Sequence, residues 1–164
     1  ILEKNKNKYE CFIANDNSNG QIVVSGTKQN IDFFSNDLNN IKIKNIKLSV
    51  SAPFHCKLMS KATDEMRNEI KSLELLEYSN KVISNVTAKE ISDKAEIKDL
   101  LVKQIEHRVR WRESIKFMLN NHIKKFIEIG PGRVLTGLIK RIDRSVYISA
   151  INNESDILNL KIDD

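Results

Sequence analysis

The chain has 164 residues, of which 40% are hydrophobic and 30% are charged, a composition typical of a folded globular domain. No apolar run approaches the roughly 20 residues that a membrane-spanning helix needs, and no apolar signal region lies near Ile1. We therefore expect no membrane anchor, no membrane partner and a cytoplasmic location.

The net charge of +5 comes from 27 basic and 22 acidic residues that are spread along the whole sequence. Nucleic-acid-binding surfaces usually combine a clustered basic patch with aromatic side chains for stacking, and only 6% of the residues are aromatic. The charge favours an acidic protein partner and gives little support for nucleic acid.

Two cysteines, Cys11 and Cys56, lie far apart and match no metal-ligand spacing. Reduced thiols in a reducing compartment are therefore expected, and no metal site is predicted. Cys56 directly follows His55, but successive side chains of a strand or helix point apart, so the two are not expected to act as a catalytic pair.

The first predicted elements are two short strands. Apolar segments at 11–14 and 21–24 flank a cluster of turn-forming residues at 15–20. This pattern predicts two strands joined by a polar loop.

A helix is predicted next, over about residues 28–39, because Ile31, Phe34 and Leu38 fall on one helical face. Residues 41–50 then alternate apolar side chains with lysines, which predicts a strand with one buried face. Two strands, a helix and a longer strand indicate what remains of a small α+β unit, so a domain boundary is expected near residue 50, with domains at 1–50 and 51–164.

The second half alternates helices and strands, which predicts an α/β layer with parallel strands. Helical spacing of apolar residues begins just after His55, so this histidine is expected at or just before a helix N-terminus. The elements expected after that helix are a strand at 82–86, helices at 97–105 and 111–119, a strand at 125–129, a tight turn at 130–132, a helix at 135–142 and a strand at 146–150.

The segment Ser51–Cys56 carries the residue with the clearest chemical potential. A histidine accepts and returns protons near neutral pH, and Pro53 stiffens the chain just before His55. Small residues at 51 and 52 leave room around the ring, as a side chain facing a substrate cavity would need. A histidine that merely fills the junction of strand and helix is the alternative from sequence chemistry alone.

The motifs Ser51–Cys56 and Phe126–Leu135 resemble those of the malonyl-CoA:acyl carrier protein transacylase family. The resemblance runs from about Tyr9 to about Ala150. It implies an α/β fold in which residues 51–164 form the C-terminal part of an α/β-hydrolase-like large subdomain. Residues 1–50 would be the remainder of a ferredoxin-like small subdomain.

The resemblance also implies roles for individual residues. His55 matches the histidine of a Ser-His dyad, and Phe54 matches a residue that lines the acyl pocket, where its bulk favours malonyl over a methyl-branched group. Gln104 matches a glutamine whose main-chain carbonyl orients the catalytic histidine. Core packing for Phe54 and a polar helix end for Gln104 are the alternatives.

Two asparagines, Asn15 and Asn17, resemble residues of the small subdomain that face the active-site cleft, although a turn-forming role explains them equally well. The turn Gly130–Gly132 resembles the glycine-proline-glycine corner between a strand and a helix in the family. Its expected role is structural, because glycine adopts dihedrals that other residues avoid.

The family's nucleophile is missing from this sequence, which has no Gly-x-Ser-x-Gly elbow. In the family the elbow, an arginine for the malonyl carboxylate and an oxyanion-hole glutamine all lie upstream of the matching region. The chain is thus expected to supply the histidine but not the serine, and to be inactive alone.

The implied activity is malonyl transfer from malonyl-CoA to the phosphopantetheine thiol of acyl carrier protein in fatty acid synthesis, by a ping-pong mechanism. No bound cofactor is implied, since malonyl-CoA and the carrier's phosphopantetheine are substrates. A non-catalytic basic module that binds an acidic protein or nucleic acid is the alternative function.

Overall fold

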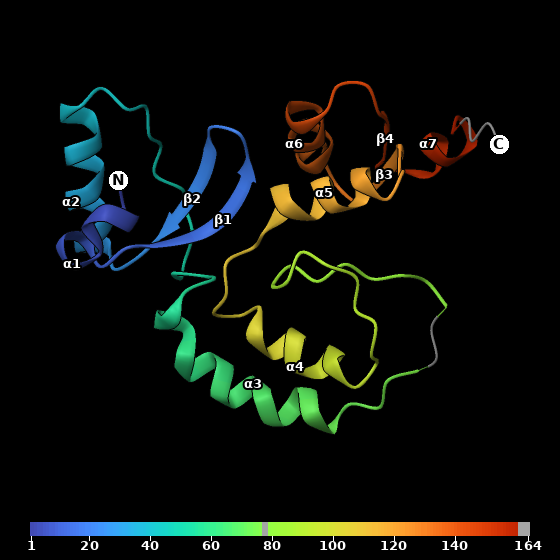
Figure 1. The fold of residues 1–164 in the computed structure, drawn as a ribbon, viewed down its shortest axis with the longest axis horizontal. Helices are drawn as coiled ribbons and strands as arrows, with labels where there is room; N and C mark the ends of the chain where they lie inside the picture. The colour runs from blue at the N-terminus through green and yellow to red at the C-terminus, as the bar shows by residue number, and fades with distance from the viewer. Residues whose placement is uncertain (77–78, 161–164) are drawn as a thin grey trace.

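The computed structural model describes residues 1–76 and 79–160 and has a mixed α/β fold in three groups of elements (Figure 1). The first group comprises η1 (Glu3–Asn5), α1 (Lys6–Tyr9), β1 (Phe12–Ser18), β2 (Gln21–Ser25) and α2 (Lys28–Asn40). The second comprises η2 (Lys57–Met59), α3 (Ser60–Ser72) and α4 (Glu96–Lys103). The third comprises α5 (Trp111–Asn120), β3 (Lys125–Ile129), α6 (Val134–Ile142), β4 (Tyr147–Ile151) and α7 (Glu154–Leu158).

Strands β1 and β2 form an antiparallel hairpin, as predicted, but its turn is shorter than expected. The polar residues 15–18 belong to β1, and the chain reverses only at Asn19 and Gly20. The difference arises because Asn15, Asp16 and Ser18 pair with residues 21–23 of β2, and Asn15 also forms a parallel bridge with Val109. Turn-forming residue types therefore lie in a strand because strand partners are available on both sides.

Helix α2 confirms the prediction for residues 28–39. Its apolar face packs Ile31, Phe34 and Leu38 against Tyr9 and Cys11, and this cluster is the core of the first group. The helix begins at Thr27, whose hydroxyl oxygen accepts a hydrogen bond from the main-chain N–H of Asn30 (3.2 Å). Local periodicity and a capping residue together define this element.

The prediction of a strand at 41–50 is wrong. The segment has no ladder partner within the described residues, and its apolar side chains are exposed, with Ile46 at 74%. Side chains attach it to α2 instead: Asn45 accepts a hydrogen bond from the Ser35 hydroxyl (2.6 Å), and Lys47 pairs with Asp32 (2.6 Å). Alternation of apolar residues gives a strand only where a neighbouring edge is available to pair with it.

The prediction of a strand at 82–86 is also wrong. In the part of the chain that the structure describes, this segment forms a single bridge, between Ile83 and Glu90, and between them the chain turns back on itself. The Ser84 hydroxyl accepts from the main-chain N–H of Val86 (3.1 Å), and the Ser84 carbonyl accepts from the N–H of Ala88 (2.8 Å). A serine side chain that satisfies the main chain locally has replaced the expected ladder.

In the third group β3 and β4 pair in parallel, which confirms the predicted parallel strands. Helix α6 crosses between them and buries Leu138 and Ile139. Strand β1 contacts both α5 and α6, so the hairpin lies against the second half of the chain (Figure 1). The domain boundary near residue 50 stays a prediction. Among the described residues, no helix has both the length and the apolar character to cross a bilayer.

Candidate active site

His55 lies in the loop that leads into η2 and α3, as predicted, and its ring is partly exposed. Its main-chain N–H donates a hydrogen bond to the carbonyl of Ile105 (3.2 Å). The loop is thus attached to the chain just after α4, and the imidazole is not buried among aliphatic side chains.

The Nδ1 atom of His55 lies 2.8 Å from the main-chain oxygen of Gln104. Helix α4 ends at Lys103, so the carbonyl of its C-cap residue Gln104 lies in the last turn, where helical carbonyls lack intrahelical partners. A carbonyl only accepts hydrogen bonds, so Nδ1 must carry the proton. Nε2 is then left free to accept one.

The backbone of His55 is strained, with φ at +61°. Of the other non-glycine residues with positive φ among those described, Glu10 is the C-cap of α1, and Lys42 and His122 lie two residues beyond the ends of α2 and α5. Ala88 lies in the turn at 84–89. Left-handed residues are usual at helix ends, but His55 precedes a helix, and strain of this kind is concentrated at functional sites.

Phe54 is exposed, with 45% of its surface accessible, so core packing does not account for it. Its main-chain oxygen accepts a hydrogen bond from the hydroxyl of Ser25 (2.7 Å), at the end of β2. Sequence reasoning missed Ser25, because nothing local to it indicates a contact with residue 54. This bond ties the hairpin directly to the histidine loop.

Asn15 and Asn17 lie on β1 and are half-buried, whereas Ala14, Asp16 and Ser18 between and beside them are buried. The two asparagines therefore share one face of the strand. Among the residues that the structure describes, neither amide is hydrogen-bonded to His55. The structure brings together His55 and Gln104, while the role of the asparagines stays a prediction.

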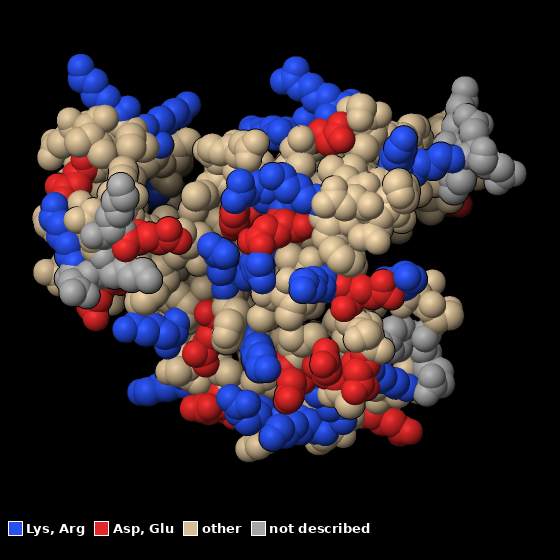
Figure 2. Space-filling view, viewed as in Figure 1, with Lys and Arg blue, Asp and Glu red and all other residues tan. Residues whose placement is uncertain are grey.

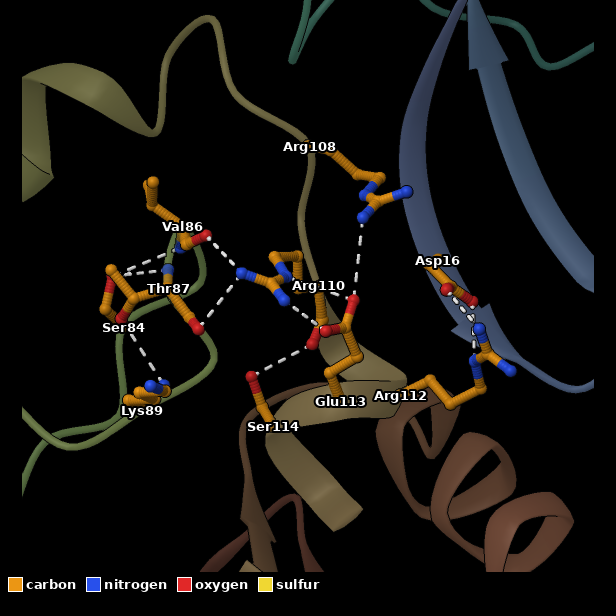
Figure 3. A network of polar contacts seen from close by, with 10 residues as sticks. All are labelled: Asp16, Ser84, Val86, Thr87, Lys89, Arg108, Arg110, Arg112, Glu113 and Ser114. Carbon is orange, nitrogen blue, oxygen red and sulfur yellow. Dashed lines mark hydrogen bonds and ion pairs between the residues drawn. The ribbon is translucent and has the colours of Figure 1, made fainter. Parts of the chain in front are cut away.

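A network of ion pairs joins β1 to the start of α5 (Figure 3). Arg112 makes two hydrogen bonds to the carboxylate of Asp16, at 2.9 and 2.7 Å, and this pairing raises the pKa of the arginine. Glu113 pairs with Arg110 and, at 3.5 Å, with Arg108. The only sequence signal was the alternation of arginines at 108, 110 and 112, which does not identify the partners.

The two thiols are free and buried, as expected of reduced cysteines. Burial raises the pKa of both Cys11 and Cys56, so the reactive thiolate is disfavoured at each. The thiol of Cys56 donates to the carbonyl of Pro53 (3.2 Å) rather than to the neighbouring imidazole of His55. A cysteine nucleophile activated by His55 therefore has no support.

The Gly130–Gly132 turn leads into α6, whose N-terminal N–H groups are already occupied. The Glu128 carboxylate accepts hydrogen bonds from the N–H groups of Leu135 (3.0 Å) and Thr136 (2.7 Å). A helix N-terminus that is capped by its own carboxylate does not offer a phosphate cradle. The described residues contain no group of side chains suited to a metal ion.

No protein-family model matches the chain, but a comparison with curated proteins finds relatives. A malonyl CoA-acyl carrier protein transacylase of Bacillus subtilis (strain 168) is 37% identical over 146 residues, which cover 88% of this chain and 46% of that protein. The Staphylococcus aureus (strain COL) transacylase is 38% identical over 145 residues, covering 88% of this chain and 47% of that protein.

Solved structures agree in fold. A Clostridium perfringens malonyl CoA-acyl carrier protein transacylase superimposes with a TM-score of 0.89 at 30% identity, covering 96% of this chain and 50% of that one. A complex of a type II PKS acyl-carrier protein with its malonyl-transacylase gives a TM-score of 0.86 at 33% identity, covering 91% and 48%.

The chain has a mixed α/β fold, and the relatives that share it form a class of proteins named as transacylases. Within that class, the chain belongs to the malonyl CoA-acyl carrier protein transacylase family and corresponds to the C-terminal part of its members. The chain spans about half the length of the curated relatives that it matches.

Proposed function

We propose that this chain supplies the histidine half of a malonyl-CoA:acyl carrier protein transacylase that acts in the cytoplasm in fatty acid synthesis. In this proposal residues 1–50 are the remainder of a ferredoxin-like small subdomain, and residues 51–164 are the C-terminal part of a hydrolase-like large one. The nucleophilic serine lies outside the sequence described here.

In the first half-reaction Nε2 of His55 takes the proton of the serine hydroxyl as the oxygen attacks the malonyl thioester carbonyl. The carbon–sulfur bond then breaks, and coenzyme A leaves as a thiol with the proton that His55 returns. In the second half-reaction the phosphopantetheine thiol gives its proton to His55 and attacks the malonyl ester. The serine oxygen leaves with that proton, which restores the starting state.

The observation that carries the proposal is the contact between Nδ1 of His55 and the carbonyl of Gln104, at 2.8 Å. It holds the imidazole in the tautomer that a general base needs, with the other nitrogen unprotonated. The left-handed backbone at His55 adds support, because the surrounding structure maintains a strained conformation there that is not part of a helix C-terminus.

The substrates follow from the relatives and from the residues beside His55. The bulky ring of Phe54 next to the reacting group suits malonyl better than a methyl-branched acyl group. The net charge of +5 suits an acidic carrier protein. On the face in Figure 2, basic and acidic side chains are interspersed rather than gathered into one basic patch, which favours a protein partner over nucleic acid.

A chimeric enzyme tests the proposal. The chain is fused behind the nucleophile-containing N-terminal half of the Bacillus subtilis relative, and malonyl transfer from malonyl-CoA to acyl carrier protein is measured. We expect His55→Ala to lower kcat by about 10²–10⁴-fold, the usual contribution of a general base.

His107 offers a matched control, because its Nδ1 also lies against a main-chain oxygen, that of Lys103 (2.6 Å), on an exposed surface. His107→Ala should leave transfer within about twofold of the parent. Unchanged transfer in a folded His55→Ala chimera would remove His55 from the mechanism and favour the binding-module alternative.

A further inference from the structure

The segment between α4 and α5 contacts both the histidine loop and the β1–β2 hairpin. At its start, the carbonyls of Gln104 and Ile105 accept the two hydrogen bonds from His55. Five residues after Gln104, Val109 joins the hairpin: its N–H donates to Ala14 (2.8 Å), and its carbonyl accepts from the N–H of Asp16 (2.9 Å). The Gln104 carbonyl, which accepts the hydrogen bond from the imidazole, is thus connected to β1 through one short stretch of chain.

Arg112 fixes the far end of this segment. Its guanidinium meets the Asp16 carboxylate with two parallel hydrogen bonds, Nε to Oδ1 at 2.9 Å and Nη2 to Oδ2 at 2.7 Å, and a third reaches Asn19 (3.2 Å). Asp16 is only 6% exposed, and both of its carboxylate oxygens accept hydrogen bonds from this guanidinium. A planar, two-point contact fixes orientation, which an ammonium group at the same place does not do.

Arg110 holds the same segment from the opposite side (Figure 3). Its main-chain N–H donates to Asn85 (3.0 Å), and its guanidinium donates to the carbonyls of Val86 (3.4 Å) and Thr87 (3.2 Å). The turn at 84–89 lies on one side of the segment. On the other side, the Val109 backbone bonds attach it to β1, and the contact between Arg112 and Asp16 adds the side-chain attachment that sets its orientation.

We propose that Asp16 and Arg112 are positioning residues for the histidine: their ion pair holds the 104–112 segment so that the carbonyl of Gln104 meets Nδ1 of His55. The same pair also anchors strand β1, whose other face carries Asn15 and Asn17. The inference rests on the proposed function for its catalytic consequence, but its structural claim concerns the tautomer of His55 and is measured without activity.

The first test is ¹⁵N NMR of the full 164-residue chain with labelled histidine, at a pH where imidazoles are neutral. The His55 signals are assigned by their loss in His55→Gln. In the parent chain we expect the Nδ1-protonated tautomer to dominate. In Arg112→Lys, which keeps the charge but loses the two-point contact, we expect at least about a threefold shift in the tautomer ratio towards protonation at Nε2.

Asp16→Asn serves as a second variant, since it removes the charge and keeps the shape. Tyr9→Phe is the stability control, because it removes the hydrogen bond from the Tyr9 hydroxyl to Asp37 (2.9 Å) in the core of the first group. We expect Tyr9→Phe to leave the tautomer ratio unchanged. An unchanged ratio in Arg112→Lys, in a chain whose amide spectrum remains dispersed, overturns the proposal.

The second test places the same variants in the chimeric transacylase. Arg112→Lys should lower kcat by about tenfold and leave KM for malonyl-CoA within about twofold, because the base is misaligned while substrate binding is kept. A kcat within twofold of the parent contradicts the catalytic consequence. Because the function itself is tested by His55→Ala and the tautomer by NMR, the two proposals fail in different measurements.

Discussion

Nδ1 of His55 and the main-chain oxygen of Gln104 lie 2.8 Å apart, across 49 residues of sequence. The acceptor is a backbone atom at the end of α4, so the helix, rather than the side chain at 104, determines where it lies. This distinction separates two kinds of substitution near the site, those that change the side chain at 104 and those that turn its carbonyl.

Gln104→Ala should therefore be nearly neutral. We expect malonyl transfer by the chimera to stay within about twofold and the His55 tautomer to be unchanged, because alanine keeps the helical backbone. Ile105→Pro is the matched opposite: a proline disfavours the α conformation of the residue before it, and Gln104 has φ −64° and ψ −17°. It should reduce kcat by about tenfold or more. Equal activity of the two variants would show that the carbonyl is irrelevant.

The strained backbone of His55 predicts an unusual order of stability. With φ at +61°, the left-handed backbone costs a residue with a Cβ roughly 1–2 kcal/mol of conformational free energy relative to glycine. His55→Gly should accordingly be more stable to denaturant than His55→Ala by about 1 kcal/mol, with both inactive in transfer. Urea unfolding of the two variants measures the difference. An alanine variant as stable as the glycine variant would mean that the left-handed conformation is not maintained.

Phe54 provides a test of substrate selection. Because its side chain is exposed, its removal should change stability little, by about 0.5 kcal/mol or less. If the ring crowds a methyl branch, Phe54→Ala should raise kcat/KM for methylmalonyl-CoA relative to malonyl-CoA by about tenfold. Both substrates are compared in the chimera. Phe33→Ala, an exposed phenylalanine on α2, serves as the control and should leave the ratio unchanged.

The elements that sequence predicted well are those whose signal is local. Helix α2 combines an apolar face with a capping threonine, and β3 follows a helix and precedes a glycine turn. The strand prediction for residues 41–50 was wrong because alternating isoleucine and lysine shows only that the segment is compatible with a strand. It does not show whether the edge of another strand is available for pairing. The segment's polar side chains bind α2 and leave the backbone without a ladder.

In the candidate site, too, some residues could be predicted from the sequence and others depend on how distant elements meet. His55 and Gln104 were predicted through a resemblance that extends over most of the chain, and their contact is present in the structure. Asp16 and Arg112 are 96 residues apart, and neither lies in a pattern that distinguishes it from a solvated charge. Their pairing depends on how β1 and α5 meet, which periodicity within either element does not specify.

The Glu113–Arg110 pair predicts a contribution to stability that depends on pH. A hydrogen bond with Arg110 is the main cause that lowers the pKa of Glu113, against the opposing effect of burial. A carboxylate whose folded pKa lies below the unfolded value of about 4.3 stabilises the fold above that pH, and the contribution is lost as pH falls through the folded pKa. The side chain is one-third exposed, so solvent screening limits the contribution to about 1 kcal/mol or less.

Glu113→Gln should therefore lower the free energy of unfolding at pH 7 by up to about 1 kcal/mol, and the difference should disappear towards pH 3. Glutamine resembles the protonated acid in shape, so parent and variant converge once the carboxylate is neutral. Urea unfolding at several pH values gives the comparison. Glu65→Gln, on the exposed face of α3, controls for the loss of one negative charge. A Glu113→Gln deficit that persists undiminished at pH 3 would instead indicate a packing defect.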